Sequence, residues 1–269
     1  VELKARFDEE RNLHWANELQ KAGDHVIYGV RGLKTHTKLA LVVRREGDGL
    51  RSYAHIGTGN YHVKTARMYT DFGLFTCDPS VTRDVVTLFH HLTGYSSEPE
   101  FDQLLVAPLN MRERFIGLIE REAANRRAGR PARIVVKINQ LEDLLVCEAL
   151  AAASQAGVPV DLIVRGFCCL RPAIAGWTEN VRVRSVIGRF LEHGRLFYFA
   201  NGQEDPLAGE FLIGSADWMD RNLSRRVEAV TPVTSRALRE RLWEVLQVQL
   251  EDRRNAWEMQ PDGSYLRLG

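Results

Sequence analysis

The sequence predicts an α/β fold made of two similar halves. One observation behind this prediction is a histidine-centred motif that occurs twice, at His36 and at His193. Another is the order of apolar strand, amphipathic helix and apolar strand in the later half, which is typical of a parallel strand pair. The 269 residues include 45% hydrophobic and 26% charged residues, enough for a sizeable core.

Each copy of the motif is a histidine, one spacer, a basic residue and then an apolar strand. The first copy reads HTKLALVV from His36, and the second reads HGRLFYF from His193. A turn follows at equal distance, since Gly57 lies 21 residues after His36 (57 − 36) and Gly214 lies 21 after His193 (214 − 193). Agreement in order, residue type and spacing indicates an internal repeat.

Further predicted elements recur in both halves. They are an upstream strand (1–6 and 160–165), a strand after the turn (71–76 and 226–231) and an amphipathic helix (82–94 and 234–251). The second half alone has a full opening unit, with strand 133–139, helix 141–156 and strand 158–164. We therefore expect a first half that is truncated at its N-terminus.

These patterns divide the chain into four predicted regions. They are an incomplete first half (1–108), a connecting helix (109–130), a second half (131–260) and a C-terminal tail (261–269).

Charge, cysteine usage and hydropathy exclude several classes of protein. The net charge of +1 does not support a basic field for nucleic acid. The four cysteines lack the spacing of a zinc site, and Cys168 and Cys169 are adjacent, so we expect reduced thiols. No apolar run reaches the roughly 18 residues that span a bilayer. A P-loop kinase is excluded because its phosphate-binding motif is missing.

The repeated motif suits phosphoryl transfer. His36 and Lys38, two residues apart on one predicted strand, share a face, so an imidazole can attack while the cation meets phosphate oxygens. Imidazole titrates near pH 6.5, so a neutral, nucleophilic form exists at pH 7. The turn adds backbone amides and the side chain of Asn60. Two facing half-sites would supply one nucleophilic and one acid/base histidine.

Other side chains are candidates for phosphate or nucleotide contacts. Arg195 occupies the position of Lys38 in the second copy, and Arg165 ends a strand, where α/β sheets place ligand groups. Tyr69 lies in a polar stretch that we expect at a cleft, and Lys137 is a weaker phosphate candidate. Asn60 either shapes the turn or orients a histidine, and both roles are compatible.

The motif resembles that of the phospholipase D superfamily, in which a repeated His-x-Lys is followed by a Gly-Ser/Thr-x-Asn turn. This resemblance implies two α/β/α halves, each with a mixed sheet flanked by helices, related by a pseudo-two-fold axis. The usual aspartate seven residues after each histidine is replaced by Val43 and Ala200. The second copy also has Arg195 for lysine and Asp217 for asparagine. These departures argue against a standard phosphodiesterase.

Longer motifs resemble the C-terminal catalytic half of the type 1 polyphosphate kinases. They are GLKTHTK, IGTGNY, TARMYTD, LTGY, IVRG, RFLEH and SADWM. That family implies reversible transfer of the terminal phosphate of ATP to inorganic polyphosphate, with Mg²⁺ and a phosphohistidine. It also implies a cytoplasmic enzyme, in some cases peripheral to the membrane, that binds ATP, ADP and polyphosphate and is a homo-oligomer at full length.

The resemblance assigns roles by position. It makes His36 the phosphorylated residue, His193 its acid/base partner, and Tyr69 and Arg165 nucleotide or phosphate contacts. Arg6 matches a position at the magnesium–phosphate site, where a guanidinium without a free lone pair would bind phosphate oxygens.

Two alternative functions remain open. A phospholipase D-type phosphodiesterase, either a nuclease or a lipid hydrolase, would use the same histidine chemistry. A nuclease should show a stronger basic surplus, and a lipid enzyme an exposed apolar loop. The chain could also be an inactive catalytic fragment.

Overall fold

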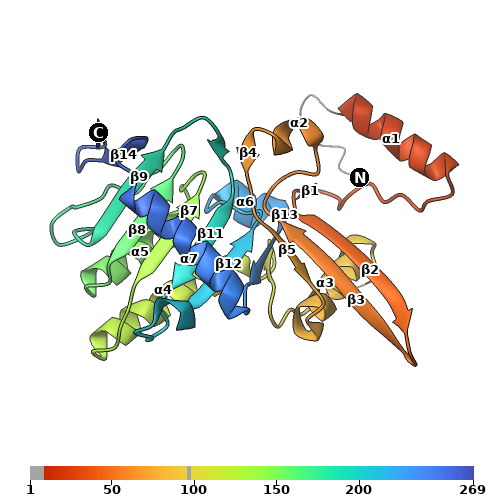
Figure 1. Ribbon diagram of the computed structural model, residues 1–269, viewed down its shortest axis with the longest axis horizontal. Helices are drawn as coiled ribbons and strands as arrows, with labels where there is room; N and C mark the ends of the chain where they lie inside the picture. Colours follow the sequence, from red (N-terminus) through yellow and green to blue (C-terminus); the bar gives the residue numbers. More distant parts are fainter. Residues whose placement is uncertain (1–8, 96–97) are drawn as a thin grey trace.

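The computed structural model describes residues 9–95 and 98–269, and Figure 1 shows their arrangement. The helices are α1 (Glu9–Lys21), α2 (Val63–Ala66), α3 (Pro79–Leu92), α4 (Met111–Arg127), α5 (Leu144–Gln155), α6 (Asp220–Arg225) and α7 (Arg236–Glu251), with a 3-10 helix at Pro206–Ala208. The strands are β1 (Lys34–Thr35), β2 (Lys38–Glu46), β3 (Gly49–Gly57), β4 (Tyr69–Thr70), β5 (Gly73–Thr76), β6 (Leu105–Ala107), β7 (Ile134–Ile138), β8 (Val160–Val164), β9 (Val181–Val186), β10 (Leu191–Glu192), β11 (Arg195–Phe199), β12 (Glu210–Gly214), β13 (Arg226–Pro232), β14 (Ala256–Met259) and β15 (Tyr265–Arg267). The predicted strand 1–6, with Arg6, lies outside the described residues.

The second half is built on a mixed sheet. The strand order is β1-β13-β12-β11-β7-β8-β9-β14-β15, and β6 also pairs with β13. The predicted strand–helix–strand unit is confirmed as β7, α5 and β8, and β7, β8 and β9 are parallel. All five residues of β7 and of β8 are buried, because a parallel sheet is covered on both faces.

Alternation along β11 shows how the two faces of this sheet are filled. Phe197 and Phe199 pack into a core with α4 and α5, whereas Leu196 and Tyr198 pack into a core with α7. On the first face, the ring of Phe197 lies in contact with that of Trp218, at a centroid distance of 5.4 Å. Period-two alternation in β11 therefore places helices on both sides of the sheet, as the sequence predicts for an α/β fold.

The first half contributes a three-stranded antiparallel sheet, β2-β3-β5. Helix α3 covers one face of this sheet. Val85 and Leu88 of the helix share a buried core with Ala54 and Ile56 of β3. The helix begins slightly before its predicted start, because Pro79 suits the first turn and the Asp78 side chain accepts a hydrogen bond from the Ser80 N–H at 2.9 Å. In Figure 1 the β2–β3 hairpin projects away from the second half.

Two short parallel strand pairs join the halves and follow the internal repeat. In one, Lys34 of β1 pairs with Arg226 of β13; in the other, Leu191 of β10 pairs with Tyr69 of β4. The shift that moves His36 onto His193 is 157 residues (193 − 36), and it also moves Lys34 onto Leu191 and Tyr69 onto Arg226. The junction therefore has the pseudo-two-fold relation that the repeat predicts.

The remaining segments belong to the same body. Helix α4 packs against α5 in the core of the second half, and β15 extends the large sheet through β14. All four cysteines are free thiols, as predicted. None of the helices in the described part of the chain is both long and apolar enough to cross a membrane.

Candidate active site

Equivalent backbone bonds hold the two histidine turns at the junction of the halves. His36 and the residue after it both donate their N–H groups to the carbonyl of Val227, at 2.9 Å each. His193 and the residue after it make the same two bonds to the carbonyl of Thr70, at 3.2 and 2.8 Å. Each histidine is thus anchored by the other half of the molecule.

His36 binds a carboxylate that lies in the second half. Its Nδ1 is 2.8 and 2.9 Å from the two carboxylate oxygens of Glu228 on β13. Glu228 is fully buried, and the Ser215 hydroxyl donates a hydrogen bond to it. Burial lowers the pKa of His36 below 6.5, although the Glu228 carboxylate opposes this shift. The ring is therefore neutral at pH 7, and its Nδ1–H faces Glu228.

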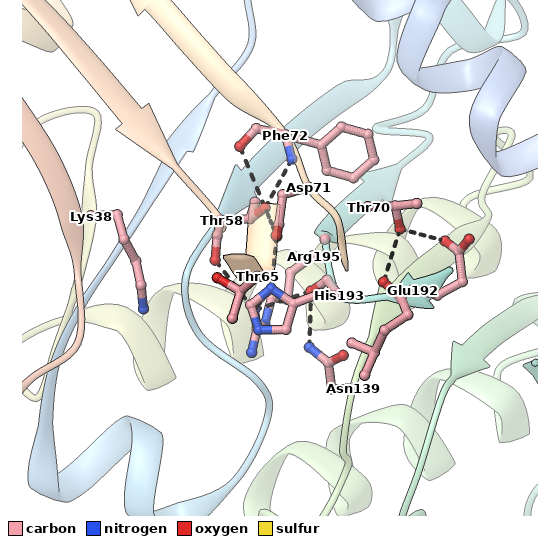
Figure 2. A network of polar contacts seen from close by, with 12 residues as sticks. Lys38, Thr58, Thr65, Thr70, Asp71, Phe72, Asn139, Glu192, His193 and Arg195 are labelled. Atoms are coloured by element: carbon pink, nitrogen blue, oxygen red, sulfur yellow. Dashed lines mark hydrogen bonds and ion pairs between the residues drawn. The ribbon is translucent and has the colours of Figure 1, made fainter. Parts of the chain in front are cut away.

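His193 binds a carboxylate that lies in the first half. Its Nδ1 is 2.7 Å from Oδ1 of Asp71, which also accepts a hydrogen bond from the Thr58 hydroxyl at 2.6 Å (Figure 2). Burial lowers the pKa of His193 below 6.5, against the opposing effect of Asp71. The two carboxylates are exchanged between halves, because Asp71 follows His36 by 35 residues (71 − 36) and Glu228 follows His193 by 35 (228 − 193).

This arrangement decides which ring nitrogen can react. A histidine that donates from Nδ1 to a carboxylate keeps its lone pair on Nε2. The carboxylate also orients the ring and stabilises positive charge that develops on it. In both copies, therefore, Nε2 is the nitrogen that carries the lone pair, and in the second copy this lone pair faces Arg195 Nη1 at 3.1 Å.

Lys38 is the cation next to the first histidine. It is 6% exposed, and its amine donates to the backbone carbonyl of His36. Burial lowers the pKa of Lys38 to about 7, with Glu228 opposing the shift and Arg195 and Arg226 adding to it. The amine therefore changes charge near neutral pH, close to the site.

Arg195 is the corresponding cation of the second copy. Its Nη1 donates to Nε2 of His193 at 3.1 Å, and its Nη2 binds Asp217 at 3.0 Å. Burial would raise the pKa of Asp217, but the Arg195 guanidinium outweighs this effect and lowers it. Charge effects cross between the two copies. Arg195 helps to lower the pKa of Lys38, and Lys38 helps to lower the pKa of His193. The two half-sites thus share one electrostatic environment.

Tyr69 and Arg165 border the second histidine. The ring of Tyr69 lies 5.0 Å from the ring of His193, measured between centroids. Arg165 Nε donates to Asn139 Oδ1 at 2.8 Å, and Asn139 Nδ2 donates to the carbonyl of His193 at 3.0 Å. A hollow of about 290 Å³ opens beside them, lined partly by Arg165 and Arg189.

Two further predicted residues, Asn60 and Lys137, make no contact with the rings of His36 and His193 in the described structure. Asn60 is exposed, and its carbonyl accepts the N–H of His62, which suits the turn role. Lys137 is 2% exposed, and its amine donates to the carbonyl of Gly194, so its role as a phosphate contact stays a prediction.

Asp71 and Glu228 are site residues that the sequence patterns did not predict. Both lie in or beside segments predicted as strands, but their strands were aligned so that Asp71 corresponded to Arg226. The structure shifts that alignment by two residues and makes Asp71 equivalent to Glu228. The signal was present as an acidic residue 35 positions after each histidine. Val43, where the superfamily usually has aspartate, supplies no carboxylate, and its side chain is half exposed.

The described residues do not form a dedicated metal cage. Across residues 9–95 and 98–269, no group of three His, Cys, Asp or Glu side chains could hold a metal ion. The site carboxylates are bonded to histidine or arginine, as with Asp71 and Asp217.

Comparison with known proteins places both halves in one family. The model described as Polyphosphate kinase C-terminal domain 1 matches residues 1–98, and that of C-terminal domain 2 matches residues 104–269. The chain is 58% identical over 267 residues to a polyphosphate kinase of Synechocystis sp., covering 99% of this chain and 36% of that protein. It is 52% identical over 267 residues to one of Streptomyces coelicolor, with 99% and 35% covered.

A solved structure agrees with the sequence comparison. The crystal structure of polyphosphate kinase from Porphyromonas gingivalis superposes with a TM-score of 0.87 at 38% identity. The match covers 95% of this chain and 39% of that one. The chain thus spans little more than a third of the relatives that it matches.

Proposed function

The chain belongs to the polyphosphate kinase family, and from this we propose that it is the catalytic part of an enzyme that transfers the terminal phosphate of ATP reversibly to inorganic polyphosphate. The observation that carries the proposal is the pair of histidines whose Nδ1 atoms are held by carboxylates from opposite halves. This pairing leaves two Nε2 atoms for one nucleophile and one acid/base group.

In the first step, Nε2 of His36 attacks the γ-phosphorus of ATP. A P–N bond forms, the bond to the β–γ bridging oxygen breaks, and ADP leaves with that electron pair. Glu228 stabilises the positive charge on the ring, and Lys38 in its charged form attracts the phosphoryl oxygens. Such positioning and charge stabilisation supply most of the catalysis in phosphoryl transfer.

In the second step, a terminal oxygen of polyphosphate attacks the phosphohistidine. The P–N bond breaks, and its electron pair returns to Nε2 of His36. His193, neutral before the reaction, accepts at its Nε2 the proton of the attacking terminal phosphate and returns it to the leaving oxygen in the reverse direction, with Asp71 stabilising the charged ring. Positioned proton transfer of this kind adds roughly 10²–10⁴-fold to a rate.

Further groups would bind the substrates. Arg195 and Arg165 are cations for phosphate oxygens, and Tyr69 lies at the edge of the second histidine. Mg²⁺ would enter with the nucleotide and neutralise charge on its phosphates.

Labelling tests the assignment of the nucleophile. Because the chain spans about a third of its relatives, the assay uses the longest natural form of the protein that carries it. With γ-labelled ATP and Mg²⁺, this protein should acquire acid-labile, base-stable label, and His36→Ala should abolish it. The label should be attached to Nε2, because Nδ1 is bonded to Glu228. Persistent label in His36→Ala would contradict the assignment.

A further inference from the structure

An ion pair with a buried cation lies behind the turn that carries His193. Lys137, on β7, is 2% exposed, and its Nζ donates to the carbonyl of Gly194 at 3.0 Å. The same amine is 3.3 Å from Oε2 of Glu192. Lys137 therefore contacts both the residue before His193 and the residue after it.

The carboxylate of Glu192 also binds two other elements. Its Oε2 accepts a hydrogen bond from the Thr70 hydroxyl at 3.0 Å and one from the Gln249 amide at 2.7 Å. Figure 2 shows the Thr70 contact beside the His193–Asp71 bond. Since Thr70 directly precedes Asp71, one carboxylate oxygen connects the turn of His193 with the segment that supplies its partner.

General stability does not account for this pair. Removing two charges from water costs free energy, and apolar replacements of similar volume often stabilise a protein equally well or better. Burial lowers the pKa of Lys137, with Glu192 opposing, as expected for a costly internal cation. The repeat also shows that the turn can form without the acid, because the position equivalent to Glu192 is Thr35 (192 − 157). The pair is thus specific to the turn of His193.

We propose that Lys137 and Glu192 are positioning residues that hold the imidazole of His193 against Asp71. Neither would touch substrate; both would act through His193. This inference rests on the proposed function, in which His193 is the acid/base group. A displacement of about 1 Å at such a group can cost about 10²-fold in rate.

Two variants test the proposal in the full-length protein that carries this chain. Lys137→Met removes the amine but keeps an unbranched apolar side chain, and Glu192→Gln keeps the shape and the contacts to Thr70 and Gln249. Each should lower kcat by about 10–100-fold and leave KM for ATP within about twofold. Glu192→Gln keeps the test decisive if Lys137→Met does not fold.

The decisive comparison repeats each variant in a His193→Ala background. His193→Ala itself should lower turnover by orders of magnitude without loss of folding. If Lys137 acts through His193, Lys137→Met should then change kcat by less than about twofold. An equal loss of kcat in both backgrounds would show a general structural role and overturn the proposal.

Arg133→Met is the matched control. Arg133 precedes the other end of β7 and binds buried Asp161 at 2.9 Å, so its removal also breaks an ion pair on the same sheet. We expect a lower melting temperature with unchanged kcat. Loss of kcat in Arg133→Met equal to that in Lys137→Met would also count against the positioning role.

Failure of the proposed function would look different. In that case, wild-type protein forms no polyphosphate from ATP. A crystal structure of Lys137→Met then decides the positioning role alone: a His193 ring displaced from Asp71 supports it, and an intact 2.7 Å bond overturns it.

Discussion

Lys38 is a buried cation whose charge depends on pH in the neutral range. Its pKa falls from 10.5 in the unfolded chain to about 7 in the fold, chiefly because of burial. Between these two values the unfolded chain binds a proton that the folded protein does not. Stability should therefore rise with pH across this window, by up to about 1.4 kcal/mol for each pH unit.

A substitution separates this contribution from all others. The stability of the wild type relative to Lys38→Met should increase from pH 7 to pH 9, as measured by denaturant unfolding at each pH. Below pH 7 the difference should be constant, because both states of the wild type are then protonated. Lys64→Met, at an exposed position, serves as control and should show no such trend. A difference that falls as pH rises would contradict the shifted pKa of Lys38.

At the scale of elements, the turn after β3 places Asp71 for His193. A Cβ on Gly59 would overlap the Asp71 carboxylate, and a Cβ on Gly194 would lie 2.7 Å from the Phe72 ring. Both positions therefore require glycine, because the side chains of Asp71 and Phe72 lie too close to the backbone for a Cβ atom. The turn and the histidine motif are packed against the same short segment.

Gly59→Ala should displace Asp71 and so lower turnover by about 10²-fold, with substrate affinity largely kept. Steady-state kinetics with ATP would measure both quantities. Gly117→Ala is the matched control, because a Cβ there meets nothing within 4 Å and alanine favours the helix α4. We expect normal turnover and slightly higher stability for the control. Normal turnover in Gly59→Ala would show that Asp71 does not need this turn.

Elements whose formation depends on local sequence were predicted, and elements that depend on pairing with distant segments were not. The β7–α5–β8 unit and α3 and α7 were predicted because their apolar periodicity is a local property of the chain. The two-residue strands β1, β4 and β10 have no such pattern. They form because β1 pairs with β13 and β4 pairs with β10, and the partners in each pair are more than 120 residues apart in the sequence.

At the scale of the whole molecule, each half supplies the carboxylate that binds the other half's histidine. Glu228 raises the pKa of His36, and Asp71 raises that of His193, in each case against burial. The halves therefore cannot form complete sites separately. This exchange couples their docking to the chemistry of both histidines.

Glu228→Gln should lower the pKa of His36 further and leave that of His193 unchanged, whereas Asp71→Asn should do the reverse. NMR titration of the histidine ring protons would measure both effects, with assignments from His36→Ala and His193→Ala. Turnover should fall by about 10²-fold in each variant, because ring orientation is also lost. If each substitution instead altered the histidine of its own half, the exchanged arrangement would be wrong.

The sequence alone determined the two-half α/β fold, the paired histidines, and the basic residues Lys38 and Arg195 beside them. These conclusions depend on residue type, period and spacing, which the chain carries locally. Only the tertiary structure decided that Glu228 serves His36 and Asp71 serves His193, across separations of 192 and 122 residues. It also placed the buried amine of Lys137 against the carbonyl of Gly194 and the carboxylate of Glu192. Contacts between distant segments depend on how the halves dock through β1, β4, β10 and β13, and no local pattern specifies that docking.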